Sequence, residues 1–321
     1  MFCLSDEKKK SKKKVLLVLI ILAICIIGLI AILLFNNVRF TTNIHEISDS
    51  FDKIIIDAYN CDVSFELSND KKCSIEFVEH PDLHCIFDSN DGNLIISTDD
   101  HRNWFDNLFV FNTSSKIKVY LPKDKYTYLF INCGRGDISV PDSLTFDSLS
   151  IVNESGNVEC SADVPGSLSI DNTLGDIRVE KAKVGDVILT NSSGNISVAD
   201  CESKNIININ QVSSDIVLEG IKGKSVVVGC DSGDAFLTDV VTTNNITIEN
   251  SIGNVVFDKS DSASINVNTK SGDIKGNLIS EKIFTANTIS GKKSVPDTKA
   301  GGECVLMSDS GNIKIEIYSE K

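Results

Sequence analysis

A row of acidic and amide residues recurs along the second half of the chain, each directly after a glycine or serine. Carboxylate and amide oxygens suit calcium, so aspartates stacked about 4.8 Å apart could hold this ion between them. The candidate ligands are Asp137, Asp176, Asp215, Asp234 and Asp273. The alternative is that each side chain only bonds the bend in which it lies. Asparagines interspersed in the row and the absence of the calcium β-roll nonapeptide favour this alternative.

Two histidines four residues apart, His80 and His84, lie among carboxylates and beside Cys85. Imidazole, thiolate and carboxylate groups are zinc ligands. The four-residue spacing, however, suits one face of a helix, whereas the flanking residues are typical of strands and Pro81 separates the two histidines. A polar surface loop is therefore the competing interpretation of this cluster.

Aromatic residues gather in HRNWFDNLFVFN at 101–112, and Trp104, Phe105 and Phe109 are candidate binding residues. Aromatic side chains are favoured in recognition sites, so this segment could bind a sugar or a partner protein. They are equally favoured in cores, and a solenoid needs a cap over the exposed end of its core. A binding loop and a covering flap are the two interpretations.

No catalytic constellation is visible in the sequence. The chain contains no Gly-Lys-Ser/Thr phosphate loop, no serine elbow and no histidine after residue 101. A polysaccharide-active solenoid needs an acid or base between long loops, and the repeats here are too short to build such walls. The sequence predicts a protein that is not an enzyme and has no cofactor.

The elements that position these residues follow from one recurring turn, in which Ser-Gly is followed by Asp or Asn. Its glycine, here called the corner position, lies at 136, 156, 175, 194, 233, 253, 272, 291 and 311, with Ser214 in the same role. The intervals are all 19 or 20 residues. A period this regular predicts a solenoid.

Apolar residues keep register with the corner position, seven and five residues before it and two and four after it. In the second set only Gly276 and Lys293 break the pattern. A looser third inward position includes Leu144, Val164 and Ile279. Spacing by two predicts strands, and small polar residues three before each corner predict an inner polar ladder. An antiparallel meander is the competitor, but hairpins favour Asn-Gly over Gly-Asn.

The N-terminal region predicts a membrane anchor. Residues 1–14 contain six lysines and form a basic cytoplasmic tail, and 15–35 are 21 uncharged residues, long enough for a transmembrane helix. Residues 36–44 are then a linker, 45–128 are N-terminal β coils with the aromatic flap, and 129–321 are the regular repeats. Asp91-Gly92 is interpreted as an early copy of the corner. The C-terminal domain is therefore expected to be extracellular, on a single-pass protein in the cell membrane.

Charge and cysteine content narrow the class of partner. Beyond the basic tail the chain has 25 basic and 43 acidic residues, a net charge of −18, which argues against nucleic acid. Cys133, Cys160, Cys230 and Cys304 fall on inward positions and are expected to act as small buried apolar residues. Among Cys61, Cys73 and Cys85 one disulfide is possible outside the cell.

The in-register turns, together with KIKVYLP at 116–122 and INCGRGDISV at 131–140, resemble the putative-adhesin family of bacterial β-strand-repeat surface proteins, a domain of unknown function. The resemblance covers about residues 45 to 317. It implies a right-handed parallel β-solenoid, a single membrane anchor, and an association with envelope-stress regulators of Gram-positive bacteria. It supplies no catalytic residues.

Two functional hypotheses follow. The first is a non-catalytic adhesion module that contacts cell-wall polymer, or a host or neighbouring cell surface, through the rod or the aromatic segment. The alternative is an accessory of an envelope-stress or signalling system that acts through a membrane-protein partner.

Overall fold

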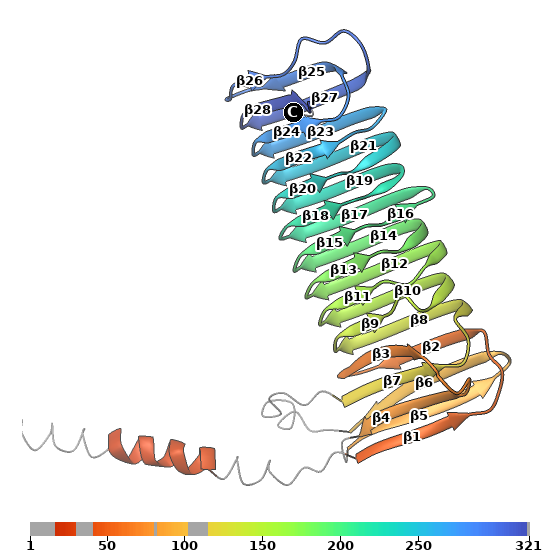
Figure 1. The fold of residues 1–321 in the computed structure, drawn as a ribbon. Coiled ribbons are helices and arrows are strands. Elements are labelled where there is room, and N and C mark those ends of the chain that lie inside the picture. The colour runs from red at the N-terminus through yellow and green to blue at the C-terminus, as the bar shows by residue number, and fades with distance from the viewer. Residues whose placement is uncertain (1–16, 30–40, 80–81, 102–114, 320–321) are drawn as a thin grey trace, which may run out of the picture.

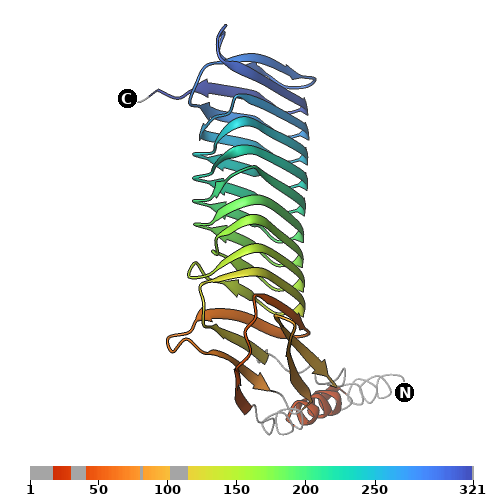
Figure 2. The ribbon, with the colours of Figure 1, turned by 90° about the vertical axis from the view of Figure 1, so that its right-hand side faces the viewer.

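In the computed structural model of the protein, residues 17–29, 41–79, 82–101 and 115–319 are described. Apart from a helix over residues 17–29, they form strands that coil into a tall stack with two facing sheets (Figure 1). Figure 2 shows the same stack turned, with one coil above the next. Pairing between neighbouring coils is parallel and in register. This confirms the predicted parallel β-solenoid and excludes the antiparallel meander.

Each regular coil consists of one long and one short strand. The long strands are β8 (Lys125–Arg135), β10 (Thr145–Ser155), β12 (Val164–Leu174), β14 (Lys183–Ser193), β16 (Glu202–Ser203) with β17 (Ile206–Ser213), β19 (Lys222–Ser232), β21 (Val241–Ile252), β23 (Ser264–Ser271), β25 (Lys282–Thr288) and β27 (Gly302–Ser310). They lie in one sheet, here called the long-strand sheet.

The short strands lie in the facing sheet, here called the short-strand sheet. They are β9 (Ile138–Val140), β11 (Val158–Cys160), β13 (Ile177–Glu180), β15 (Ile196–Ala199), β18 (Ile216–Glu219), β20 (Ala235–Thr238), β22 (Val255–Ser260), β24 (Ile274–Leu278), β26 (Lys293–Ser294) and β28 (Ile313–Ile317). Each begins two residues after a corner position.

The core lies between the two sheets and consists of the predicted apolar pairs. Leu168 and Ile170 on β12, and Ile177 and Val179 on β13, are at most 1% exposed. The third inward position is wrong at Ile279, which is 44% exposed, while Leu278 is buried. A β-bulge between β22 and β24 is the reason, because it shifts the register and with it the inward parity by one residue.

The corner glycines are required by backbone geometry. Gly194 has φ +113°, and a Cβ built on it would lie 2.1 Å from the carbonyl oxygen of Gly175 in the preceding coil. Neighbouring corners therefore stack backbone against backbone, which leaves no room for a side chain. Ser214 occupies the same corner with φ 109°, so one coil keeps a side chain in this strained conformation.

The N-terminal strands close one end of the stack. They are β1 (Thr41–Ile47), β2 (Lys53–Ala58), β3 (Cys61–Leu67), β4 (Cys73–Glu79), β5 (Leu83–Asn90), β6 (Asn93–Asp100) and β7 (Ser115–Leu121). β2 and β3 continue the parallel stack beside β8 and β9, whereas β4, β5 and β1 pair antiparallel.

The interpretation of Asp91-Gly92 as an early corner is wrong. These two residues form the turn of the β5–β6 hairpin, with Asn90 opposite Asn93 and positive φ at both positions. Asp-Gly is the typical sequence of such a two-residue turn.

The other end of the stack departs from chain order. The last coil, β27 and β28, is inserted between β23 and β24 on one side and β25 and β26 on the other (Figure 1). Burial explains the exchange. Ile313 and Ile315 on the inserted coil are buried, whereas the coil that ends the stack has the exposed Lys293 opposite Ile313. The more apolar coil therefore takes the inner place.

The predicted transmembrane segment, residues 15–35, extends beyond the described residues. The described helix covers 17–29. Within the described part of the chain, no helix combines the length and apolar character needed to cross a bilayer.

Candidate binding groove on the long-strand sheet

The Asp and Asn residues after the corners form a hydrogen-bonded ladder along the outside of the stack. In each coil the side-chain Oδ1 accepts the backbone N–H of the equivalent residue in the next coil; Asn195 N, for example, donates to Asp176 Oδ1 at 2.8 Å. The series includes Asp62, Asp137, Asn157, Asp176, Asn195, Asp215, Asp234, Asn254, Asp273, Asn312 and Lys292, the last as donor only. Because Asp and Asn both offer Oδ1, either residue satisfies the corner.

A second ladder lies inside the corner, as predicted. The side-chain nitrogen of Asn191 donates to the carbonyl oxygens of Gly175 and Gly194, both at 2.9 Å. Asn153 and Asn172 bridge two corners in the same way. These buried amides hold adjacent corners together, which assigns them a structural role.

The outer Oδ1 ladder and the inner amide ladder both hold the coils together. The outward face of the long strands, in contrast, has different side chains from coil to coil. One outward row runs across five strands in strict register, through Thr190, Asn210, Gly229, Glu249 and Asn268. Gly229 interrupts this row of side chains. The result is a gap between Asn210 and Glu249, which lie two strands apart, or about 10 Å.

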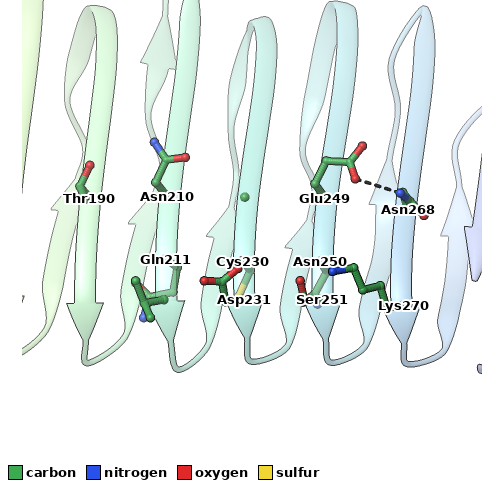
Figure 3. A pocket seen from close by; sticks show the side chains of 12 residues that line it. Thr190, Asn210, Gln211, Cys230, Asp231, Glu249, Asn250, Ser251, Asn268 and Lys270 are labelled. Atoms are coloured by element: carbon green, nitrogen blue, oxygen red, sulfur yellow. Dashed lines mark hydrogen bonds between the residues drawn. The ribbon is translucent and has the colours of Figure 1, made fainter.

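A groove of about 400 Å³ lies at this gap, here called the Gly229 groove (Figure 3). Its lining residues are Thr190, Asn210, Gln211, Val212, Gly229, Cys230, Asp231, Glu249, Asn250, Ser251, Asn268 and Lys270. In Figure 3 Asn210 and Glu249 lie on either side of the strand that carries Cys230 and Asp231, and Asp231, Ser251 and Lys270 lie nearer the corners. Gly229 belongs to this middle strand and is paired with both Asn210 and Glu249.

The glycine at 229 is not required by the fold. Its φ is not in the positive region, and a Cβ built there would meet only Asn210 Oδ1 at 3.3 Å and Ile209 O at 3.9 Å. The nearer of these atoms belongs to a side chain that can rotate. Glycine in a strand interior costs roughly 0.5–1 kcal/mol relative to alanine, and often marks close approach by a ligand.

The groove offers hydrogen-bonding groups of both kinds. Glu249 accepts a bond of 3.0 Å from the amide of Asn268, which fixes the carboxylate at the rim. Asp231, Glu249 and Lys270 together give the lining one excess negative charge. The thiol of Cys230 lies beneath, and burial raises its pKa. The lining thus suits a neutral or cationic ligand with many hydroxyl groups better than an anion.

Comparison with known protein families assigns the chain to one of them. One family matches residues 51–206 and again residues 202–321, which together cover most of the sequence. The chain belongs to the Toastrack DUF4097 family. This confirms the resemblance inferred from the periodic turns. No curated protein matches the chain.

Several solved structures are similar to this Toastrack chain at low identity. A putative adhesin from Parabacteroides distasonis is 15% identical, with 85% of this chain and 98% of that one covered and a TM-score of 0.45. A putative adhesin from Parabacteroides merdae is 14% identical, with 85% and 97% covered and a TM-score of 0.44. A putative lipid binding protein from Parabacteroides distasonis is 16% identical, with 86% and 97% covered and a TM-score of 0.42.

The histidine, aromatic and calcium sites proposed from the sequence stay predictions. His84 lies exposed on β5, and His80 is outside the described residues, as are Trp104, Phe105 and Phe109. In the described ranges no three His, Cys, Asp or Glu side chains gather as a metal site. The calcium hypothesis for the Asp row therefore stays a prediction, beside an Oδ1 ladder that already explains the row.

The cysteines of the rod are buried as predicted. Burial raises the pKa of the Cys160 and Cys304 thiols to about 12, so both are protonated and unreactive at neutral pH. Cys73 is a free thiol with its pKa raised to about 12 in the same way. In this structure Cys73 is therefore not part of the disulfide considered for Cys61, Cys73 and Cys85.

The sequence predicts none of the groove residues as a site. The available signal is a glycine outside the corner positions, four residues before the corner Gly233 and on the outward parity of a strand. Its meaning depends on Asn210 and Glu249, which only the coil-to-coil register brings to either side of it.

Proposed function

We propose that this Toastrack chain is a non-catalytic surface protein that binds a hydroxyl-rich cell-wall polysaccharide in the Gly229 groove. The observation that supports this most directly is Gly229 itself. A glycine that the backbone does not need opens a gap in an otherwise continuous row of polar side chains.

The chemistry of the groove fits saccharide hydroxyls. Asn210, Asn268, Thr190 and Ser251 can each donate and accept, and the carboxylates of Asp231 and Glu249 accept. The bare backbone at Gly229 gives a flat floor on which the carbon face of a sugar ring can lie. Neighbouring coils repeat the strand spacing, so an extended polymer can continue along the sheet beyond the groove.

Catalysis is disfavoured by the groups available there. The lining of the groove contains no histidine, and its thiol is that of Cys230, whose pKa is raised by burial. A nucleophile needs a lowered pKa or an adjacent base. The bases in the lining are the carboxylates of Asp231 and Glu249, which we assign to hydrogen bonding with saccharide hydroxyls; Glu249 already accepts a bond from the amide of Asn268.

The same proposal places the rod outside the cell on a single membrane anchor. It rests on the sequence alone: six lysines within residues 1–14, followed by the uncharged stretch 15–35. Lysines on the N-terminal side of a span favour a cytoplasmic N-terminus, with the rod on the opposite side of the membrane. The anchor would then hold the rod at the cell surface, where it can reach cell-wall polymer without a second protein to attach it.

Co-sedimentation of the full-length chain with insoluble cell-wall polysaccharide, in a non-ionic detergent, tests the proposal. Gly229→Asn places in the gap the residue already present at 210, and we expect it to weaken binding at least tenfold. Thr173→Asn, an exposed change on β12, is the matched control and should bind as the wild type does.

Equal binding of Gly229→Asn and wild type would remove the groove from the function. Absence of wild-type binding would overturn the adhesive proposal. That result would favour the alternative, an accessory of an envelope-stress or signalling system that acts through a membrane-protein partner.

A further inference from the structure

A second hollow lies on the short-strand sheet, near the end of the stack where β28 lies between β24 and β26. Its volume is about 500 Å³. Three lysines line it, Lys275 on β24, Lys292 before β26 and Lys314 on β28, together with Ser294 and Asn312. We call it the lysine hollow.

The register of the strands sets two of these lysines directly against each other. Lys275 lies opposite Lys314, and Lys314 lies opposite Ser294 on the next strand. Like charges directly opposite on neighbouring strands are destabilising. Both side chains are exposed, so neither is held there by burial. The arrangement therefore works against the fold unless something negative lies between the ammonium groups.

Few carboxylates compensate the three lysines. Lys314 pairs with Glu316 at 2.9 Å, in a contact where both side chains are about two-thirds exposed. Asp273 also lines the hollow, and its Oδ1 accepts the backbone N–H of Asn312 at 2.7 Å, so the lining has three lysines against one carboxylate. Within the described residues, no ion pair involves Lys275 or Lys292.

Lys292 is also the exception in the outer ladder. Its place belongs to Asp or Asn in the other coils from residue 137 on. Its backbone N–H still donates to Asn312 Oδ1 at 3.0 Å, so the ladder reaches this coil. The side chain accepts nothing in return, because an ammonium group is only a donor. In this coil the row ends in a cation, and Lys292 lines the same hollow as Lys275 and Lys314.

The net charge of the last coils differs from that of the rest of the rod. Residues 129–269 contain 8 basic and 20 acidic residues, whereas residues 270–321 contain 8 basic and 7 acidic ones. The end of the rod is thus slightly positive on a strongly negative molecule. An anion would be repelled along most of the rod and attracted at this end.

We propose that the lysine hollow binds a phosphate group. Lysine binds phosphate as a point charge, and three ammonium groups around one hollow, with the Ser294 hydroxyl beside them, suit a tetrahedral oxyanion. This site is separate from the Gly229 groove, which lies on the other sheet and has the opposite charge preference. It adds a second ligand class to the proposed function and does not depend on the first.

Thermal unfolding and titration calorimetry of the full-length chain in non-ionic detergent test the site, with long-chain polyphosphate as the probe. We expect polyphosphate to raise the Tm of the wild type and to bind with an affinity that falls as salt rises. Lys275→Gln should weaken binding at least tenfold. Without the probe, the same variant should melt at or above the wild-type temperature, since it removes a repulsion.

Lys204→Gln is the matched control, because Lys204 is an exposed lysine between β16 and β17. It should bind polyphosphate as the wild type does. Equal loss in Lys204→Gln and Lys275→Gln would overturn the proposal, since it would reveal diffuse charge attraction without a site. Absence of any stabilisation of the wild type by polyphosphate, together with no preference for phosphatidylglycerol micelles, would also overturn it.

Mixed micelles distinguish the source of the phosphate. A Lys275-dependent affinity for phosphatidylglycerol micelles over phosphatidylcholine micelles would support a lipid headgroup as the ligand. Binding of polyphosphate without that preference would support a soluble phosphate polymer. Either result keeps the phosphate site, whereas failure of both probes removes it.

Discussion

Two glycine-to-alanine changes, at Gly194 and at Gly229, should alter stability in opposite directions. Gly194 lies at a corner, has φ +113°, and leaves 2.1 Å between a built Cβ and the oxygen of Gly175. Gly229 lies in the middle of β19, has no positive φ, and leaves 3.3 Å to the nearest atom, a side-chain oxygen. The chemical change is the same, and only the surroundings differ.

The magnitudes follow from these surroundings. For Gly194→Ala the left-handed backbone costs roughly 1–2 kcal/mol, and the backbone shift forced by the contact costs about 1–3 kcal/mol more. We expect a loss of about 2–5 kcal/mol in the free energy of unfolding. Gly229→Ala instead removes the conformational freedom of glycine in the unfolded chain, and should stabilise by about 0.5–1 kcal/mol.

Local opening is the appropriate measurement, because a solenoid is stabilised coil by coil. Hydrogen exchange of peptides from β14 and β15 should accelerate in Gly194→Ala, and exchange of peptides from β19 should slow in Gly229→Ala. Ser214→Gly is a third arm, since it relieves a side chain at φ 109° and should slow exchange around its corner.

Slower exchange in Gly194→Ala would refute the corner geometry. Faster exchange in Gly229→Ala would show that the fold requires this glycine, and the groove would lose its main support. The two outcomes are independent of each other.

Two further predictions concern the outer ladder and the buried thiols. Asp176→Asn keeps the acceptor for Asn195 N and should change the free energy of unfolding by less than about 0.5 kcal/mol, whereas Asp176→Ala should cost about 0.5–1.5 kcal/mol in urea unfolding. Burial raises the pKa of Cys160 from 9.0 to about 12, so between these pH values the unfolded chain releases a proton that the folded chain keeps. Stability should fall as pH rises through this range, by up to about 1.4 kcal/mol per pH unit for this thiol, and urea midpoints of Cys160→Ala should fall less steeply.

The periodic part of the fold is predictable because its causes are local. A corner needs glycine for its backbone, Asp or Asn after it for the next coil, and a small polar residue three before it, and each coil repeats this within about twenty residues. Apolar parity then fixes which residues enter the core. The hairpin turn at Asp91-Gly92 is also predictable from the sequence, since Asp-Gly is a favoured sequence for a two-residue hairpin turn.

The order of the last two coils is not predictable in this way. The corners at 272, 291 and 311 keep the same period whichever coil lies next to β23 and β24. The order depends on which coil gains more by burial, and the equivalent inward residues that differ most are Lys293 on one coil and Ile313 on the other. The 19- or 20-residue period is the same for both orders, so only the break in the apolar pattern at Lys293 distinguishes the two coils.

That exchange of coils sets how close Lys275 and Lys314 lie at the end of the rod. In chain order, Lys275 would lie opposite Ser294, and Lys314 would be one strand further away, about 10 Å from Lys275. Insertion of β28 halves this separation, and at about 5 Å two charges in water repel by roughly 0.8 kcal/mol, against about 0.4 kcal/mol at the longer distance. The fold thus accepts a small electrostatic cost when it places Ile313, and not Lys293, beside Ile274. A phosphate between the two lysines would turn that cost into attraction, so anion binding should favour the inserted order over the sequential one.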